Sequence, residues 1–180
     1  MADLRFERTE KMIQFAFLDL LKTTPYEKIS IAKLARVSMV DRTTFYAHFD
    51  NLSELADTLI ENALAPFVAA FLESKEQKMK RNFDSYTFFS HELVDHLLSN
   101  RSQIETVREL PLGANSFDHR LRKLFTETYT TFLKLPETDF TIFLFVNLAM
   151  ANFDFILKNS RVPSKKELQL GLKRMESFLK

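Results

Sequence analysis

The spacing of apolar residues constrains the fold of this chain more than any other feature of its sequence. In successive segments apolar side chains recur at intervals of three, four and seven residues, which places them on one face of an α-helix. The chain of 180 residues contains only two glycines, and tight turns and sheet bulges commonly use glycine. The sequence therefore predicts an all-α protein of about nine helices joined by short loops.

Capping residues and prolines delimit the predicted helices of the N-terminal part. The apolar face of the first helix carries Phe6, Ile13, Phe17, Leu20 and Leu21. This helix ends before Pro25, because the residue that precedes a proline resists helical geometry. Ser30 can cap a short second helix over residues 31–37. Asp41 can cap a third helix over residues 42–49.

A longer fourth helix is predicted to begin at Asn51 and Glu54, which resemble a capping box. Pro66 is predicted to kink this helix or to end its first part. Beyond a polar junction at residues 75–81, further helices are predicted over residues 86–99, 102–109, 116–135, 138–159 and a last segment opened by a capping box of Ser164 and Glu167. The helix over residues 138–159 is apolar nearly all round, so it must be covered on most sides, whereas the last helix has a one-sided stripe.

The composition excludes several classes of protein and site. Apolar residues make up 46% and charged residues 27%, which is ordinary for a soluble globular protein. The absence of cysteine excludes disulfides, thiolate metal sites and cysteine nucleophiles, and it fits a reducing cytoplasm. The most apolar stretch, Ile142 to Leu157, contains three polar residues and is shorter than the roughly 20 residues of a spanning helix. We therefore expect a cytoplasmic protein without a membrane segment.

The segment ISIAKLARVSMVDRTTFYAHF, residues 29–49, combines two short helices and a turn of three or four residues. This is the minimum unit that places a helix in the major groove of DNA. Its predicted internal contacts come from Leu34, Ala35, Val40 and Phe45. Its second helix is predicted to present outward Arg42, Thr43, Thr44, Ala47 and His48. Arginine pairs with guanine edges or phosphates, and threonine contacts thymine methyl groups or phosphates. An ordinary helical hairpin within a core is the alternative interpretation.

The run DRTTFYAHF at residues 41–49, followed by DNLSEL at residues 50–55, resembles the DNA-binding domain of the TetR/AcrR family of transcriptional regulators. The resemblance implies an N-terminal three-helix, helix-turn-helix DNA-binding domain over residues 1–50. It implies a C-terminal helical bundle over residues 51–180, which senses a ligand and dimerises. In this family the third helix lies in the major groove.

The resemblance also implies which residues contact DNA. The residues that match Tyr46 and His48 often contact phosphates in the family, and the starts of the second and fourth helices tend to touch the DNA backbone. Together with the outward side chains of the third helix, the predicted DNA-binding residues are Ser30, Arg42, Thr43, Thr44, Tyr46, His48, Asn51 and Ser53.

Two departures from the family pattern bear on affinity for DNA. Met39 stands in the turn where the family usually has glycine, so a positive φ angle there would cost about 1–2 kcal/mol. Leu52 lies near a position where the family often has a lysine for a phosphate contact. Residues 1–55 hold eight Lys/Arg and eight Asp/Glu, so no excess of positive charge attracts DNA. We expect modest non-specific affinity and a shallow dependence on salt.

The resemblance assigns the helical body two roles. An apolar or aromatic small-molecule effector would bind between helices, in a pocket whose lining by family position is Phe88, His91, Phe125, Tyr129 and Asn147. Packing in a core is the alternative role for each of them. The last two helices of the family pair with their symmetry mates, which implies a homodimer with Phe145, Leu148, Phe153 and Leu172 at or near its interface. A dimer also suits an operator, because it presents two recognition helices about 34–36 Å apart or a multiple of that distance.

The sequence thus predicts a transcription regulator that represses from a double-stranded DNA operator under the control of an effector in the helical body. The alternative is a regulator of the same fold that a protein partner controls. No nucleophile–base pair, glycine-rich phosphate loop or paired-carboxylate motif is present, so no enzyme is predicted. Histidines and acidic residues share helix faces within residues 91–96, but without the H-E-x-x-H spacing of zinc proteases. Neither a cofactor nor a metal is predicted.

Overall fold

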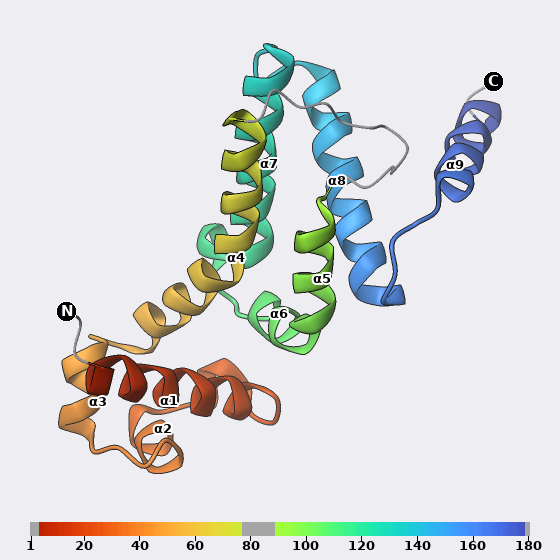
Figure 1. The fold of residues 1–180 in the computed structure, drawn as a ribbon. Helices are drawn as coiled ribbons and strands as arrows, with labels where there is room; N and C mark the ends of the chain where they lie inside the picture. Colours follow the sequence, from red (N-terminus) through yellow and green to blue (C-terminus); the bar gives the residue numbers. More distant parts are fainter. Residues whose placement is uncertain (1–3, 77–88, 179–180) are drawn as a thin grey trace. The chain divides into compact units, whose positions relative to one another are not determined.

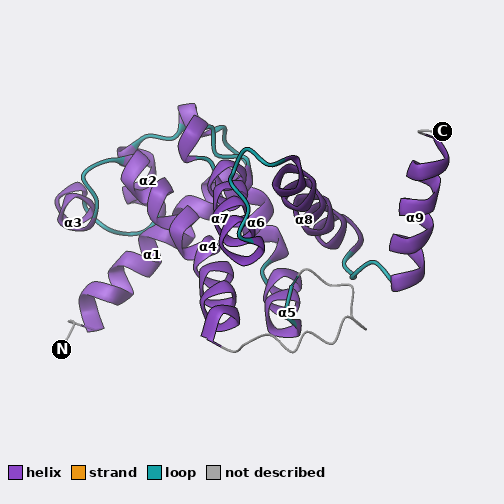
Figure 2. Ribbon diagram, turned by 90° about the horizontal axis from the view of Figure 1, so that it is seen from above, coloured by secondary structure: helices purple, strands orange, loops and turns teal. Residues whose placement is uncertain are grey.

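The computed structural model describes residues 4–76 and 89–178 (Figure 1). Within these ranges the regular structure is helical throughout and includes no strand, which confirms the all-α prediction (Figure 2). The α-helices are α1 (Leu4–Leu21), α2 (Ile31–Val37), α3 (Arg42–His48), α4 (Leu52–Glu76), α5 (His91–Ser99), α6 (Arg101–Arg108), α7 (Phe117–Leu133), α8 (Phe140–Asn159) and α9 (Lys165–Phe178). Two short 3-10 helices, η1 (Tyr26–Lys28) and η2 (Gly113–Asn115), lie in the connections.

Side-chain caps fix where α2 and α3 begin, as the sequence predicted. The Ser30 hydroxyl oxygen accepts a hydrogen bond from the Lys33 backbone N–H at 3.2 Å. The Asp41 carboxylate accepts one from the Thr44 backbone N–H at 2.6 Å. Each cap satisfies a backbone donor that the first turn of a helix leaves without an intrahelical partner. The boundaries of these two short helices are therefore set locally.

The start of α4 is capped almost as predicted. The Asn51 side-chain oxygen accepts from the Glu54 backbone N–H at 3.0 Å. The Glu54 carboxylate reaches back to the backbone N–H of Asp50, one residue earlier than a standard capping box would require. The prediction that Pro66 ends the first part of this helix is wrong, because α4 continues to Glu76. The carbonyl of Asn62, which loses its helical donor to the proline, belongs to an exposed residue that water can reach.

Helix α5 begins at His91 with Ser90 as its N-cap, whereas the sequence predicted a helix over residues 86–99, of which residues 86–88 lie outside the described part. The capping box of α9 is confirmed: the Ser164 hydroxyl accepts from the Glu167 backbone N–H at 3.2 Å, and the Glu167 carboxylate accepts from the Ser164 backbone N–H at 2.8 Å. Cap signals thus located helix starts at both ends of the chain.

Backbone contacts divide the chain into two compact units. Unit 1 comprises Met1–Leu64 and Ser102–Arg120, and unit 2 comprises Ala65–Arg101 and Leu121–Lys180. Unit 1 therefore contains the helix-turn-helix segment together with the start of α4, α6 and the start of α7. The functional division at residue 50 stays a prediction.

Unit 1 has a core of its own, in which α1 and α3 both pack against α2. The fully buried side chains of this unit include Ile13, Phe17, Leu34, Phe45, Leu55, Leu59 and Ile60. Arg120 of α7 pairs with Asp57 of α4 at 2.5 Å, which ties two distant parts of the sequence together within the unit. Phe6, predicted to lie on the buried face of α1, is 45% exposed.

Unit 2 has an aromatic core. Its buried rings are Phe67, Phe71, Phe89, Phe125, Tyr129 and Phe153. Neighbouring rings meet edge to face or stacked, for example Phe67 and Phe153 at 5.8 Å between centroids and Phe89 and Phe125 at 5.9 Å. Aromatic pairs favour both arrangements, and each ring buries a large apolar area. Helix α5 packs against α8 in this unit.

Two helices of the described part are long and apolar enough to cross a membrane by length and composition alone. The candidate spans are Leu52–Leu72 and Phe140–Asn159, and 44% of the most apolar 18-residue window of each is buried inside the protein. The apolar run in α8 was predicted to be too short to span, but the helix that contains it has 20 residues. Core helices of soluble proteins pass the same test, so this is weak evidence for a membrane protein.

Candidate DNA-binding surface

The packing between α2 and α3 is that of a helix-turn-helix. Leu34, Ala35 and Phe45, predicted as internal contacts, are buried, and Val40 is half-buried. The backbone N–H of Val40 donates to the Ala35 carbonyl at 3.0 Å, which closes the turn onto the end of α2. A small side chain at Ala35 lets the two helices approach closely. The crossing of the two helices is therefore held by a buried apolar contact and by a backbone hydrogen bond.

The turn itself contains a strained residue. Met39, which stands where the resembling family usually has glycine, has a φ angle of 56°, and its side chain is 89% exposed. A non-glycine residue in this region costs about 1–2 kcal/mol. Ser38, which sequence reasoning missed, is buried and its hydroxyl donates to the Leu34 carbonyl at 2.8 Å. The signal was a serine directly after the last turn of a predicted helix.

The side chains of α3 divide into one buried anchor and a solvent-facing set. Phe45 is fully buried, and Tyr46 packs edge to face on it while remaining 48% exposed. Arg42, Thr43 and Ala47 are exposed, as predicted. Thr44 is half-buried, and its backbone N–H is engaged in the Asp41 cap. One face of α3 thus presents a cation, hydroxyl groups and a phenol to solvent.

His48 is less exposed than predicted. Its ring stacks on Phe6 of α1, with the ring centroids 3.8 Å apart and the planes inclined by 29°. The residue is half-buried, and its Nδ1 atom is buried with no hydrogen-bond partner. The prediction considered α3 alone and so missed the partner ring, which comes from the first turn of α1; the role of His48 in DNA binding stays a prediction.

The remaining predicted contacts lie at helix starts. Ser30, Asn51 and Ser53 are all exposed. Because the oxygen atoms of Ser30 and Asn51 serve as caps, the donors that they can offer a ligand are the Ser30 hydroxyl hydrogen and the Asn51 amide. Ser53 shares a hydrogen bond with Tyr26, whose pKa is raised mainly by burial.

Asp41 adds a negative charge at the start of α3. Backbone and side-chain hydrogen bonds from Thr44 lower the pKa of its carboxyl group, so it stays ionised at neutral pH. A carboxylate is favourable at a helix N-terminus. It also offsets the adjacent Arg42 charge, in line with the zero balance of residues 1–55.

The structure does not gather the predicted effector-pocket residues into one site. Phe125 and Tyr129 are buried side by side in the aromatic core of unit 2. His91 and Asn147 are exposed, and the Asn147 side-chain oxygen accepts from Arg122 at 2.8 Å. Neither residue lies in the aromatic core with Phe125 and Tyr129, and the pocket stays a prediction. Phe88 lies outside the described residues.

The predicted dimer residues are also divided. Phe145 and Leu172 are exposed and Leu148 is half-buried, whereas Phe153 is fully buried against Phe67. Phe153, predicted to lie at or near the interface, fills the core of its own unit and presents no surface to a partner, and the interface itself stays a prediction. Exposed apolar side chains on α8 and α9 that the prediction omitted are Phe140, Phe143, Leu144, Leu170, Met175 and Phe178.

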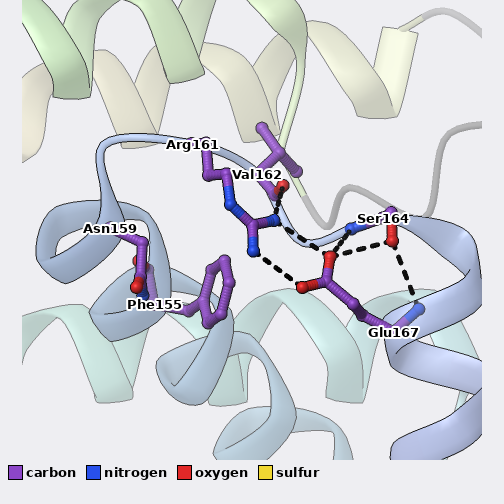
Figure 3. A network of polar contacts seen from close by, with 6 residues as sticks. All are labelled: Phe155, Asn159, Arg161, Val162, Ser164 and Glu167. Atoms are coloured by element: carbon purple, nitrogen blue, oxygen red, sulfur yellow. Dashed lines mark hydrogen bonds and ion pairs between the residues drawn. The ribbon is translucent and has the colours of Figure 1, made fainter.

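A polar network holds the turn between α8 and α9 (Figure 3). Arg161 pairs with both Glu167 oxygens, at 2.7 and 2.9 Å, and its guanidinium lies 4.9 Å from the centre of the Phe155 ring. The Arg161 hydrogen bonds, followed by those from Ser164, lower the pKa of Glu167 to about 2. Ser160 adopts a left-handed φ of 52° and caps α8. The network fixes how the chain leaves α8.

Among the described residues there is no cluster of three or more His, Cys, Asp or Glu side chains that could hold a metal ion. In the segment that suggested one, Nδ1 of His96 lies 3.3 Å from the side-chain nitrogen of Asn100. The exposed side chains of α3 therefore remain the candidate binding site.

Comparisons with known proteins identify relatives of part of the chain. An uncharacterised HTH-type transcriptional regulator of Bacillus subtilis, YxbF, is 39% identical over 67 residues, which are 37% of this chain and 18% of that protein. The dhaKLM operon transcriptional activator DhaS of Lactococcus lactis, also of HTH type, is 35% identical over 60 residues, 33% of this chain and 32% of that protein. The matches thus span less than a third of the length of either curated relative. No protein-family model matches the chain.

Both relatives carry names of transcriptional regulators rather than enzymes, in agreement with the sequence prediction. The similarity supports a transcription regulator of the helix-turn-helix type, and it is not specific to the TetR/AcrR family.

Proposed function

We propose that this chain is a sequence-specific DNA-binding regulator of transcription, of the TetR/AcrR type, that places α3 in the major groove. The observation that carries the proposal is the division of α3: Phe45 anchors it in the core of unit 1, while Arg42, Thr43 and Tyr46 face solvent. A recognition helix needs both a rigid support and a polar exposed face. The similarity to two HTH-type regulators supports the same function.

The side chains of α3 suit different parts of a duplex. Arg42 can donate two parallel hydrogen bonds to a guanine edge or bind a phosphate. Thr43 and Thr44 can contact a thymine methyl group or a phosphate oxygen, and Tyr46 can donate its hydroxyl to a phosphate. His48 would act near the end of α3 through its ring nitrogen Nε2. Base contacts would specify the sequence, and phosphate contacts would fix the register.

Residues at the starts of α2 and α4 would bind the DNA backbone on either side of α3. The Ser30 hydroxyl and the Asn51 amide keep a donor after capping, and Ser53 lies exposed in the first turn of α4. Helix N-termini attract phosphate through their oriented backbone N–H groups. With no excess of positive charge in residues 1–55, the salt dependence of binding is expected to be shallow.

We also propose a homodimer formed through α8 and α9. No residue of α9 is buried, although Leu172, Met175 and Phe178 leave an apolar stripe in solvent. Phe140, Phe143 and Phe145 add exposed rings on α8. Exposed apolar surface of this kind marks interaction sites. A two-fold dimer would bind an operator of two inverted half-sites.

Control by an effector in the helical body remains part of the proposal, with the aromatic core around Phe125 and Tyr129 as its site. To bind there, an apolar or aromatic effector would displace the contacts of the Phe125 ring with Phe71 and Tyr129. A protein partner on the body is the alternative. A repressor was predicted, but the relative from Lactococcus lactis is named an activator, so we leave the sign of regulation open. Binding to an operator agrees with the predicted cytoplasmic location.

Selection on random duplexes tests the proposed function. The full chain is incubated with a duplex library, and bound DNA is recovered and sequenced over several rounds. We expect one enriched sequence with inverted half-sites. Arg42→Ala is expected to change or abolish the enrichment, whereas Lys173→Ala, which removes an exposed cation from α9, should leave it intact. Absence of enrichment with the wild-type chain would contradict the proposal.

A further inference from the structure

The stack between Phe6 and His48 joins the first turn of α1 to the last residue of α3. The ring centroids lie 3.8 Å apart, closer than those of any other aromatic pair described here. Phe6 nevertheless remains 45% exposed, so it is not a core residue. Its ring covers the imidazole rather than filling the interior of unit 1. Such a contact is better suited to holding another side chain than to stabilising the fold.

The surroundings of His48 restrict the form of its ring. Nδ1 is buried without a hydrogen-bond partner, and a buried N–H without an acceptor is costly. The neutral ring avoids this cost by carrying its proton on Nε2 and leaving Nδ1 bare. The imidazole then offers one donor, Nε2–H, which suits a phosphate oxygen. The direction of this donor depends on the plane of the ring, and Phe6 is stacked on that plane.

The support of α3 is unequal along its length. The Asp41 cap holds its first turn, and Phe45 anchors its middle in the core. At its C-terminal end, the helix gives way to extended backbone at Phe49, whose ring is buried in the core. The half-buried ring of His48 is instead covered by Phe6 of α1, a helix from another part of the sequence. Losing the stack would free the His48 ring while leaving the cap and the anchor in place.

We propose that Phe6 is a positioning residue for DNA binding: its ring holds the His48 imidazole in the orientation that contacts the DNA backbone. Phe6 itself needs no contact with DNA. The inference rests on the proposed function and adds to it a residue outside the helix-turn-helix segment. It predicts that DNA affinity depends on a residue in α1 whose loss leaves the core of unit 1 intact.

The chain offers a closely matched control. Phe15 is the same residue type on the same helix and is 63% exposed. Phe15→Ala therefore removes an equal exposed ring from α1 without touching the Phe6–His48 stack. Phe6→Leu keeps apolar volume but removes the aromatic face, and Phe6→Tyr keeps that face. Phe6→Ala removes both the aromatic face and the volume. Together, the three Phe6 variants separate the effect of stacking from the effect of side-chain volume.

Two measurements on the full chain test the inference. The first is fluorescence anisotropy of a labelled duplex of mixed sequence at low salt. Phe6→Ala and Phe6→Leu are expected to bind about threefold to tenfold more weakly than the wild type, the range that an aromatic pair contributes. Phe6→Tyr should restore binding, and Phe15→Ala should not change it. Circular dichroism and thermal unfolding check that each variant keeps its fold.

The second measurement is the NMR spectrum of the histidine rings, with His48 assigned through His48→Gln. Stacking shifts the His48 ring protons upfield, and the shift should disappear in Phe6→Ala and Phe6→Leu but persist in Phe6→Tyr and Phe15→Ala. If the shift disappears while the duplex binds as before, the positioning role is overturned and the proposed function stands. If the wild type binds no duplex, the proposed function falls and this inference with it. A wild-type spectrum without the upfield shift overturns the stack itself.

Discussion

The helices α3 and α9 were predicted from the same kind of pattern, yet they differ in burial. Helix α3 has only seven residues, and its Phe45 is completely buried. Helix α9 has fourteen residues, and none of them is buried. Both helices begin at caps that the sequence indicated. The difference lies in what meets their apolar residues: α3 has a partner in the same unit, and the stripe on α9 remains in solvent.

This contrast teaches that a helical pattern reports which face of a helix is apolar and not what covers it. A short helix with an internal partner can serve as a rigid reading element. A longer helix without one favours a partner outside the chain, for which we propose a second copy.

Phe45→Ala is expected to lower the free energy of unfolding by about 3–5 kcal/mol, because it leaves a cavity between α2 and α3. The neighbouring variant Tyr46→Ala removes a ring that is half exposed and should cost much less. Urea unfolding followed by circular dichroism measures both. Equal losses in the two variants would show that α3 is not anchored as described.

Leu172→Glu is expected to weaken the proposed homodimer by about 2 kcal/mol or more, which is about thirtyfold in the dissociation constant, because it places a charge in an apolar interface. Ser177→Glu adds the same charge to the opposite side of α9 and should have little effect. Light scattering over a range of concentrations measures the mass. A wild-type chain that is monomeric at micromolar concentration would refute the dimer.

Met39→Gly is expected to raise the free energy of unfolding by about 0.5–1 kcal/mol. Relief of the left-handed strain contributes about 1–2 kcal/mol, and the greater freedom of glycine in the unfolded chain offsets about 0.5–1 kcal/mol of it. Gly113→Ala is the reverse case, because Gly113 has a φ of 54° in open space, and it should destabilise. Denaturant midpoints of the two variants should move in opposite directions.

The smallest effect concerns the turn before α9. The folded-state pKa of Glu167, about 2, lies below its ordinary value of 4.5, so the contribution of this carboxylate is present above pH 4.5 and is lost as the pH falls towards 2. Carboxyl-carbon NMR measures the titration directly. Arg161→Gln removes the main cause and should bring the pKa back towards 4.5. A wild-type pKa near 4.5 would mean that the Arg161 network does not hold the turn in solution.

The sequence predicted those features of unit 1 that depend only on residues adjacent in the sequence. The caps at Ser30 and Asp41 are local properties, and each was found where the sequence placed it. The positive φ of Met39 is also local, and the sequence marked this residue only through the glycine that the resembling family has there. The stack of Phe6 on His48 could not be predicted, because helical spacing assigned Phe6 to a buried face and said nothing of a ring in α3.

The outcome in α8 has a different cause. This helix is apolar nearly all round, so spacing could not decide which side faces its own chain. Phe153 turned inward onto Phe67, while Phe145, two turns earlier, stayed partly exposed. The exposed positions of His91 and Asn147 could not be predicted for a similar reason, because the rotation of a helix about its axis is set by contacts with residues far away in the sequence.

Mapping of a bound duplex by amide NMR tests the central claim most directly. The isotopically labelled full chain is titrated with a DNA duplex of mixed sequence at low salt, where non-specific binding uses the same phosphate contacts. We predict that amide signals shift at Ser30, along α3 and at Asn51 and Ser53, while the signals of α9 do not move. Shifts confined to α8 and α9, or no shifts at all, would contradict the assignment of α3 as the DNA-binding helix.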